Sequence, residues 1–235
     1  MSVLTVIQYM CGRTGLPVPA TVYGTTDTQV LQMLRLLEEE GNDLAKRGDW
    51  EALTREATHT TTAAEDQGAI TAIATNGFRA IKHDTLWDRT DVLPIPLIGS
   101  TAWQRMKAVA STGPRYRYRL RGGRLLITPT PAASHTLAFE YLSKNWILGA
   151  DGTTYKQYFT LDTDTILLPE DLAILGLRWR WKKEKGFDYA EDFRTYEAQV
   201  KEALGRDGGK ETLRADGEPW SAKPGICVPN YSWNL

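Results

Sequence analysis

Residues 169–204 constrain the fold more than any other stretch of this chain, because they predict two helices separated at a single glycine. The fixed φ of proline suits the first position of a helix, and Pro169 opens the first of the two. Charged residues complement the helix dipole at both ends: Glu170, Asp171, Lys182, Lys183 and Lys185. Gly186 follows, and because glycine adopts the left-handed conformation easily, the helix is predicted to end there.

The second helix of this segment carries one apolar stripe. Asp188 and Glu191 form a capping box at its start. Large apolar side chains then recur at helical spacing on one face: Tyr189, Phe193, Tyr196 and Val200. Such a stripe is typical of packing, so this segment predicts a structural scaffold rather than a catalytic site.

Another helix is predicted over residues 27–47, with Thr26 and Gln29 as its capping box. Its packing face comprises Val30, Leu34, Leu37 and Leu44, whereas Glu38, Glu39 and Glu40 are expected to face solvent. After Gly48, Asp49 is expected to cap a short helix that carries Trp50 and Leu53.

The first eleven residues are predicted to form a short packing helix or strand. No basic region precedes their apolar run, as a signal peptide would require, and the run is too short to span a bilayer. No association with a membrane is therefore expected.

The middle of the chain favours strands from residue 58 to about residue 160, interrupted by one helix over residues 100–110. The strongest signal is a hairpin, in which residues 115–121 alternate, Gly122-Gly123 form the turn and residues 124–128 return. A further alternating strand contains Leu137, Phe139 and Tyr141.

This order of elements predicts an α+β fold, with a helical-bundle domain, an inserted β-rich domain and an extended C-terminal arm. Residues 1–57 and 165–204 form the helical domain, residues 58–164 the insert, and residues 205–235 the arm. The arm is rich in Gly and Pro, with large apolar residues spread along it: Trp220, Ile226, Val228, Tyr231, Trp233 and Leu235. Since a free terminus frays, we expect these side chains to anchor the arm on a neighbouring protein rather than on its own chain.

Composition gives weaker indications of function. The formal net charge of −1 provides no global field toward nucleic acid or an anionic membrane. Eight Trp and ten Tyr favour a protein that binds proteins, because large aromatic side chains anchor interfaces. Cys11 and Cys227 are far apart and form no CxxC, so neither a zinc site nor a disulfide framework is indicated, and synthesis in a reducing cytoplasm is expected.

Candidate chemistry is sparse. Asp162 and Asp164 form a DxD motif, which either holds a divalent cation or caps a turn, and the turn is favoured because no third ligand is near in sequence. The three histidines, His59, His83 and His135, show no metal spacing. The chain has neither a nucleophile elbow nor a phosphate-binding loop. We therefore expect no enzymatic activity, no metal and no cofactor.

Two surface features leave alternatives open. The hairpin places arginines on one strand face or just past the turn: Arg115, Arg117, Arg119, Arg121 and Arg124. This stripe is a solvated face, a docking surface for another protein, or a DNA contact.

Trp179 and Trp181 lie two residues apart in a helix and face different sides, so one is expected in the core and the other against a neighbour.

Four segments together resemble phage head-to-tail adaptor proteins. The first and last are similar to the helical parts of that family: LEEEGNDLAKRGDWEALTREAT at residues 37–58 and LGLRWRWKKEKGFDYAEDF at residues 175–193. Two between them are similar to its β insert: RGGRLLITP at residues 121–129 and FEYLSKNW at residues 139–146. The resemblance covers most of residues 16–204.

The resemblance implies a structural virion protein, made in the cytoplasm of a bacterial host and placed at the portal vertex. Family members commonly form a ring of twelve subunits that joins the portal to the tail and prolongs the DNA channel, without specific binding of the genome. The insert would then face tail nozzle, hub or fibre proteins, and the arm would dock on the portal. Residues expected to pack the ring body are Leu34, Leu37, Leu44, Trp50, Leu175, Trp179, Tyr189, Phe193 and Tyr196. The alternative is a nucleic-acid-binding protein that uses the Arg115–Arg124 hairpin.

Overall fold

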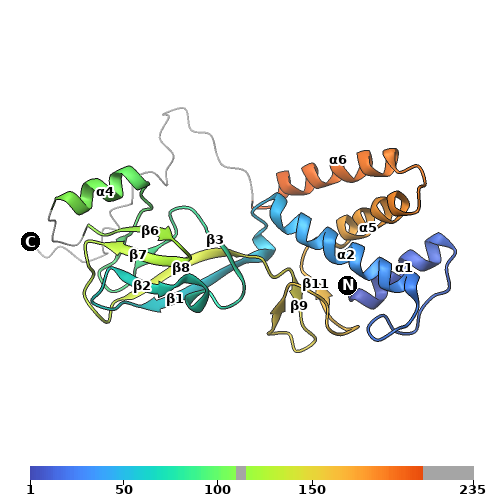
Figure 1. The fold of residues 1–235 in the computed structure, drawn as a ribbon, viewed down its shortest axis with the longest axis horizontal. Helices are drawn as coiled ribbons and strands as arrows, with labels where there is room; N and C mark the ends of the chain where they lie inside the picture. Colours follow the sequence, from blue (N-terminus) through green and yellow to red (C-terminus); the bar gives the residue numbers. More distant parts are fainter. Residues whose placement is uncertain (110–114, 209–235) are drawn as a thin grey trace, which may run out of the picture.

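The computed structural model describes residues 1–109 and 115–208. The long helices and one small sheet gather at one end of an elongated molecule, and the two larger sheets with two short helices form the other end (Figure 1). This arrangement confirms the predicted α+β class. The predicted arm anchors, from Trp220 to Leu235, lie outside the described residues.

The helical end comprises α1 (Val3–Thr14), α2 (Thr28–Arg47), α5 (Glu170–Glu184) and α6 (Ala190–Arg206). Asp27 rather than Thr26 caps α2, because its carboxylate accepts a hydrogen bond from the backbone N–H of Gln29. Gly186 separates α5 from α6 with a φ of 74°, as the sequence predicts. The short helix expected after Asp49 is only a 3-10 turn, η1 (Glu51–Leu53).

A single tryptophan fills the space between α2 and the segment that follows the long strand β8 (Thr136–Ser143). Trp146 is fully buried, meets the ring of Phe159 edge-on at 5.3 Å between centroids, and donates to Asn42 Oδ1. A Cβ atom at Gly41 would collide with the indole, so only glycine fits there.

The same core includes apolar side chains from a small sheet, formed by β9 (Ile147–Leu148), β10 (Tyr155–Lys156) and β11 (Thr165–Ile166). Residues 146–168 thus pack with the helices, although they follow the β-rich middle of the chain. The predicted domain boundaries stay a prediction.

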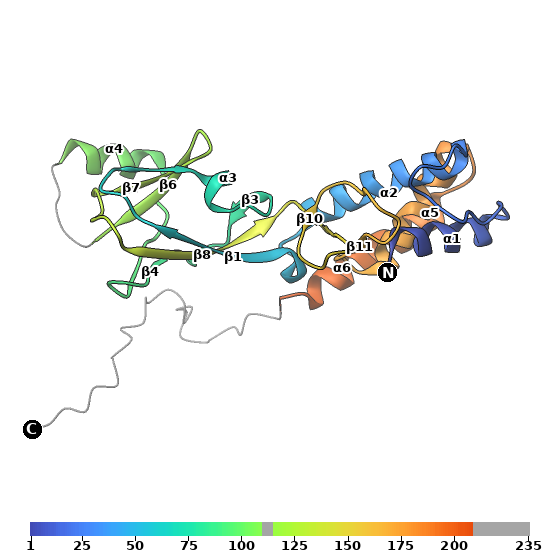
Figure 2. The ribbon, with the colours of Figure 1, turned by 90° about the horizontal axis from the view of Figure 1, so that it is seen from below.

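The β-rich end contains two sheets that enclose a second apolar core (Figure 2). One sheet has the order β1-β8-β4-β5, and β3 also pairs with β8. Its other strands are β1 (Thr54–Thr60), β3 (Phe78–Ile81), β4 (Trp87–Asp88) and β5 (Leu93–Pro94). The other has the order β2-β7-β6, with bounds Asp66–Ala69, Arg124–Thr128 and Arg117–Arg121. Strands β6 and β7 are the predicted hairpin, and both turn glycines have positive φ.

Two short helices complete the β-rich end. The helix α3 (Ile70–Ile73) follows β2, and α4 (Ser100–Ala108) is the helix predicted over residues 100–110. The predicted strand residues Leu137, Phe139 and Tyr141 lie in β8 and face the second core.

The two ends are joined where α2 finishes. The guanidinium of Arg79, on β3, donates to the carbonyls of Ala45 and Gly48 and thereby satisfies groups at the C-terminal end of α2. Lys82 pairs with Glu51, whose backbone N–H in turn donates to Asp207. Polar contacts among α2, β3 and the end of α6 therefore support the junction. None of the helices in the described ranges is long and apolar enough to cross a membrane.

Candidate interaction surfaces

A buried ion-pair network ties three helices together. Arg180 of α5 is 7% exposed, and its Nε lies 2.6 Å from Oε2 of Glu40 on α2, which is fully buried. The remaining guanidinium nitrogens donate to Glu39 and Asp43. Tyr196 of α6 donates its hydroxyl to the other oxygen of Glu40. Because each buried charge has an opposite charge and hydrogen-bond partners, the network fixes α2, α5 and α6 relative to one another.

The prediction that Glu38, Glu39 and Glu40 face solvent is wrong for two of the three. Only Glu39 is exposed. The carboxylate of Glu38 accepts a hydrogen bond from the backbone N–H of Phe159 at 3.2 Å. Glu40 lies so close to Gly176 that a Cβ atom there would collide with its carboxylate.

Burial raises the pKa of the Glu40 carboxyl, although the hydrogen bonds from Tyr196 and Arg180 oppose that shift. Burial and the neighbouring Glu40 also raise the pKa of Tyr196.

The aromatic residues of α5 and α6 divide into buried and exposed groups. Trp179 enters the core and packs on the rings of Tyr189, Phe193 and Tyr196, with centroids 5.1–6.3 Å away. Trp181 is half-buried beside Phe187. Of the residues expected to pack the ring body, Leu34, Leu37, Leu44, Trp50, Trp179 and Tyr196 are buried, Leu175 is half-buried, and Tyr189 and Phe193 are exposed. The buried members stabilise the subunit itself.

The basic hairpin presents fewer free cations than its sequence implies. Tyr116 and Tyr118 are buried, so the arginines do lie on the opposite face. Arg117 donates to the carbonyl of Tyr116, Arg119 to the hydroxyl of Ser100, and Arg124 pairs with Asp66 at 2.6 Å. Arg115 and Arg121 are exposed. This surface is therefore only a modest phosphate-binding candidate.

The DxD motif holds loops in place. Asp162 Oδ1 accepts from the backbone N–H groups of Val22 and Tyr23, at 3.1 and 2.7 Å. Asp164 is fully buried, accepts from two backbone N–H groups of its own turn and pairs with Lys156 at 2.9 Å. Burial acts to raise the pKa of Asp164, but these contacts outweigh it and the pKa is lowered. Asp164 thus has the turn role that the sequence favours, whereas the Asp162 carboxylate joins its loop to the distant loop at Val22 and Tyr23.

The structure brings together a charged cluster that sequence spacing does not reveal. His135 Nδ1 lies 2.8 Å from Oδ2 of the buried Asp88 and 3.5 Å from Oδ2 of Asp91. These two contacts connect the end of β4 and the turn after it to the residue that precedes β8. The hydrogen bond that the imidazole makes to the Asp88 carboxylate raises the pKa of His135. The three side chains offer ligand types that suit a metal, but an ion-paired hydrogen bond between the imidazole and Asp88 accounts for their geometry without one.

This cluster predicts a specific pH dependence. Because the folded pKa of His135 is raised, its stabilising contribution is fully present below the unfolded pKa of about 6.5 and is lost as pH rises through the folded value. The thermal midpoint of the β-rich end should therefore fall between about pH 6 and pH 8, and His135→Gln should remove that part of the dependence. Calorimetry across this range measures it; an unchanged profile in the variant would contradict the assignment.

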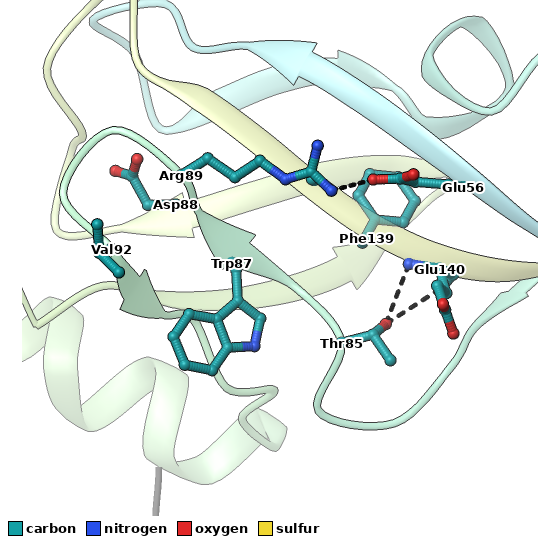
Figure 3. Close-up of a pocket in the computed structure, with 9 residues that line it drawn as sticks. Glu56, Thr85, Trp87, Asp88, Arg89, Val92, Phe139 and Glu140 are labelled. Carbon is teal, nitrogen blue, oxygen red and sulfur yellow. Dashed lines mark hydrogen bonds and ion pairs between the residues drawn. The ribbon is translucent and has the colours of Figure 1, made fainter. Parts of the chain in front are cut away.

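A shallow groove of about 530 Å³ lies on the outer face of the five-stranded sheet (Figure 3). Trp87 and Val92 provide apolar surface, and Arg89 pairs with Glu56 across it. The hydroxyl of Thr85 contacts backbone groups of Lys82 and Glu140 rather than a base. The lining residues therefore form no activated nucleophile.

Large apolar side chains are exposed at both ends of the molecule. At the helical end they include Val18, Tyr23, Tyr158 and Leu161, on the loops beside α1 and β10. At the β-rich end they include Val92, Leu97 and Val109, around β5 and α4. Each end therefore carries exposed apolar side chains that are candidates for contact with another protein.

Comparison with known proteins bears on what these surfaces contact. No curated protein matches the chain. Among protein families, the one described as SU10 adaptor protein matches residues 1–223, which include both the helical and the β-rich ends. The chain therefore belongs to the SU10 adaptor protein family, and the predicted membership of a phage head-to-tail adaptor family is confirmed.

Proposed function

We propose that copies of this chain assemble as a ring below the portal vertex, join the portal to the tail and prolong the channel through which the genome leaves. As a phage adaptor the protein has a structural role in the virion. The observation that carries the proposal is the family match, which spans nearly the whole chain.

The helical end suits the body of such a ring. A ring closes only when each subunit repeats the same angle to its neighbour, so its subunits must be stiff. The buried contacts of Arg180 with Glu40, and of Glu40 with Tyr196, supply that stiffness across α2, α5 and α6. We propose twelve subunits, the number common among such adaptors.

The β-rich end suits contact with tail proteins. It lies at the far end of the molecule from α1, as Figure 1 shows, and carries its own exposed apolar side chains, among them Val92 and Leu97. An adaptor needs two non-equivalent contact regions, because the portal and the tail offer different surfaces. We assign this end to nozzle, hub or fibre proteins of the tail.

The charge of the chain suits passage of DNA without tight binding. Each phosphate that a protein neutralises strengthens binding, and a net charge of −1 offers no general attraction. The alternative function, nucleic-acid binding through the Arg115–Arg124 hairpin, is tested by a gel shift at low salt. Tight binding that weakens steeply with salt would favour it over the adaptor proposal.

Removal of residues 209–235 tests the assembly role of the C-terminal segment. The described residues form both apolar cores, and on that basis we expect the truncated chain to keep its thermal midpoint. Its co-sedimentation with the portal ring should fall at least about tenfold, because several large apolar anchors are lost together. Arg117→Ala serves as a control and should co-sediment like the unaltered chain. Unimpaired co-sedimentation of the truncated chain would contradict the proposal.

A further inference from the structure

Positive charge is concentrated in one part of this nearly neutral chain. Residues 92–139 include seven of the 28 Lys and Arg residues and none of the 29 Asp and Glu residues. These seven cations lie on or beside α4, β6 and β7: Arg105, Lys107, Arg115, Arg117, Arg119, Arg121 and Arg124. Within residues 1–109 and 115–208, only Lys107 and Arg124 of the seven pair with a carboxylate. This side of the β-rich end is therefore basic.

The hairpin arginines and the groove on the five-stranded sheet lie on opposite sides of the β-rich end. Tyr118 of β6 and Phe139 of β8 both contribute to the core between the two sheets. Successive side chains of a strand point to opposite faces. Arg121 of β6 therefore points away from the core on one side, and Glu140 of β8, which lines the groove, points away on the other. In Figure 2 the β6–β7 hairpin lies above β8.

The groove holds more carboxylates than cations. Glu56 and Glu140 occupy directly paired positions on β1 and β8, and both line the groove beside Trp87 (Figure 3). Like charges directly opposite each other destabilise a sheet. In the part of the chain that the structure describes, Arg89 pairs with Glu56, whereas Glu140 is exposed and has no ion-pair partner. A further cation in the groove would therefore offset the repulsion between the two carboxylates.

The turn of the β6–β7 hairpin has the shape and the charge to supply that cation. Gly122 and Gly123 are exposed, and a Cβ atom at either would meet no atom of the described residues within 4 Å. The turn is therefore narrow and stands clear of its surroundings. Arg121, at its base, is exposed and has no ion pair within the described ranges. A guanidinium binds a carboxylate and also stacks on an indole, and Glu140 and Trp87 offer both in the groove.

We propose that the hairpin turn of each subunit docks in the groove of the neighbouring copy, where Arg121 pairs with Glu140, an inference that rests on the proposed ring. A contact between two different surfaces of the same chain repeats from one subunit to the next and closes with the ring. Because the two surfaces lie on opposite sides of the β-rich end, subunits that stand side by side can form it. Arg121 then contacts a carboxylate of the next subunit rather than the genome.

Charge reversal in the full chain tests this contact. Arg121→Glu and Glu140→Lys each bring like charges together, so each should raise the concentration that half-loads the portal ring at least about tenfold, as counted by native mass spectrometry. The double variant restores opposite charges and should return to the value of the unaltered chain. Both side chains are exposed, so the thermal midpoints should not change. Arg194→Glu, at an exposed arginine of α6, is the matched control and should load normally.

The outcomes separate this inference from the proposed ring. Weaker loading by both single variants, with recovery in the double variant, supports it. Normal loading by either single variant, or no recovery in the double variant, would overturn it while the unaltered chain still forms rings. If Arg121→Glu loads normally but abolishes a gel shift with DNA, the hairpin contacts DNA instead. If the unaltered chain does not load the portal, the proposed ring fails and this inference fails with it.

Discussion

Replacement of Glu40 with alanine is expected to lower the free energy of unfolding by about 3–5 kcal/mol, since removal of one partner from a buried ion pair leaves the other charge uncompensated. Glu40 is fully buried and accepts hydrogen bonds from both Arg180 and Tyr196. Its loss leaves a guanidinium that is 7% exposed without its most buried carboxylate. Three helices lose their common contact as a result.

Glu39→Ala is the matched control for this prediction. Glu39 pairs with the same guanidinium but is itself exposed, so its removal should lower the free energy of unfolding by no more than about 1 kcal/mol. Urea unfolding of both variants, monitored by helical circular dichroism, gives the comparison. Equal losses in the two variants would show that burial of Glu40 does not govern the stability of the network.

Trp146→Ala is expected to have an effect of similar size, about 3–5 kcal/mol, through the cavity left in the helical core. The indole is fully buried, packs against Phe159 and occupies the space that Gly41 leaves free. It also donates to Asn42 Oδ1, which keeps a second donor in Gln157, so the expected loss comes from the cavity rather than from an unpaired acceptor. The connection from β8 to the helical core should loosen.

Trp87→Ala provides the control for the tryptophan substitution. Trp87 is only partly buried and lines the open groove on the sheet, so its removal should lower the free energy of unfolding by about 1 kcal/mol. Calorimetry of both variants measures the difference. A larger loss for Trp87→Ala would mean that the core beneath the groove contributes more than that around Trp146.

Features encoded by neighbouring residues could be predicted from the sequence. The β6–β7 hairpin follows from alternation around Gly122-Gly123, and the break between α5 and α6 follows from lysines before Gly186. These signals are local, because turn type and helix termination depend on a few adjacent residues. The α+β class and the family resemblance follow from the order of these predicted helices and strands along the chain.

Features that depend on distant partners could not be predicted in this way. The acidic run Glu38–Glu40 has the composition of a solvated helix face, and only the fold brings Arg180 to it from 140 residues away. The pairing of His135 with Asp88 spans 47 residues in the same manner. The sequence predicts a turn role for Asp162, but the contact of its carboxylate with the loop at Val22 depends on the tertiary structure.

Native mass spectrometry of the purified chain, alone and then mixed with the portal ring of its virus, tests the adaptor account most directly. We predict a complex that carries as many copies of this chain as the portal has subunits. If the chain and the portal ring remain separate at micromolar concentration, the assignment of this protein as a portal-binding ring is contradicted.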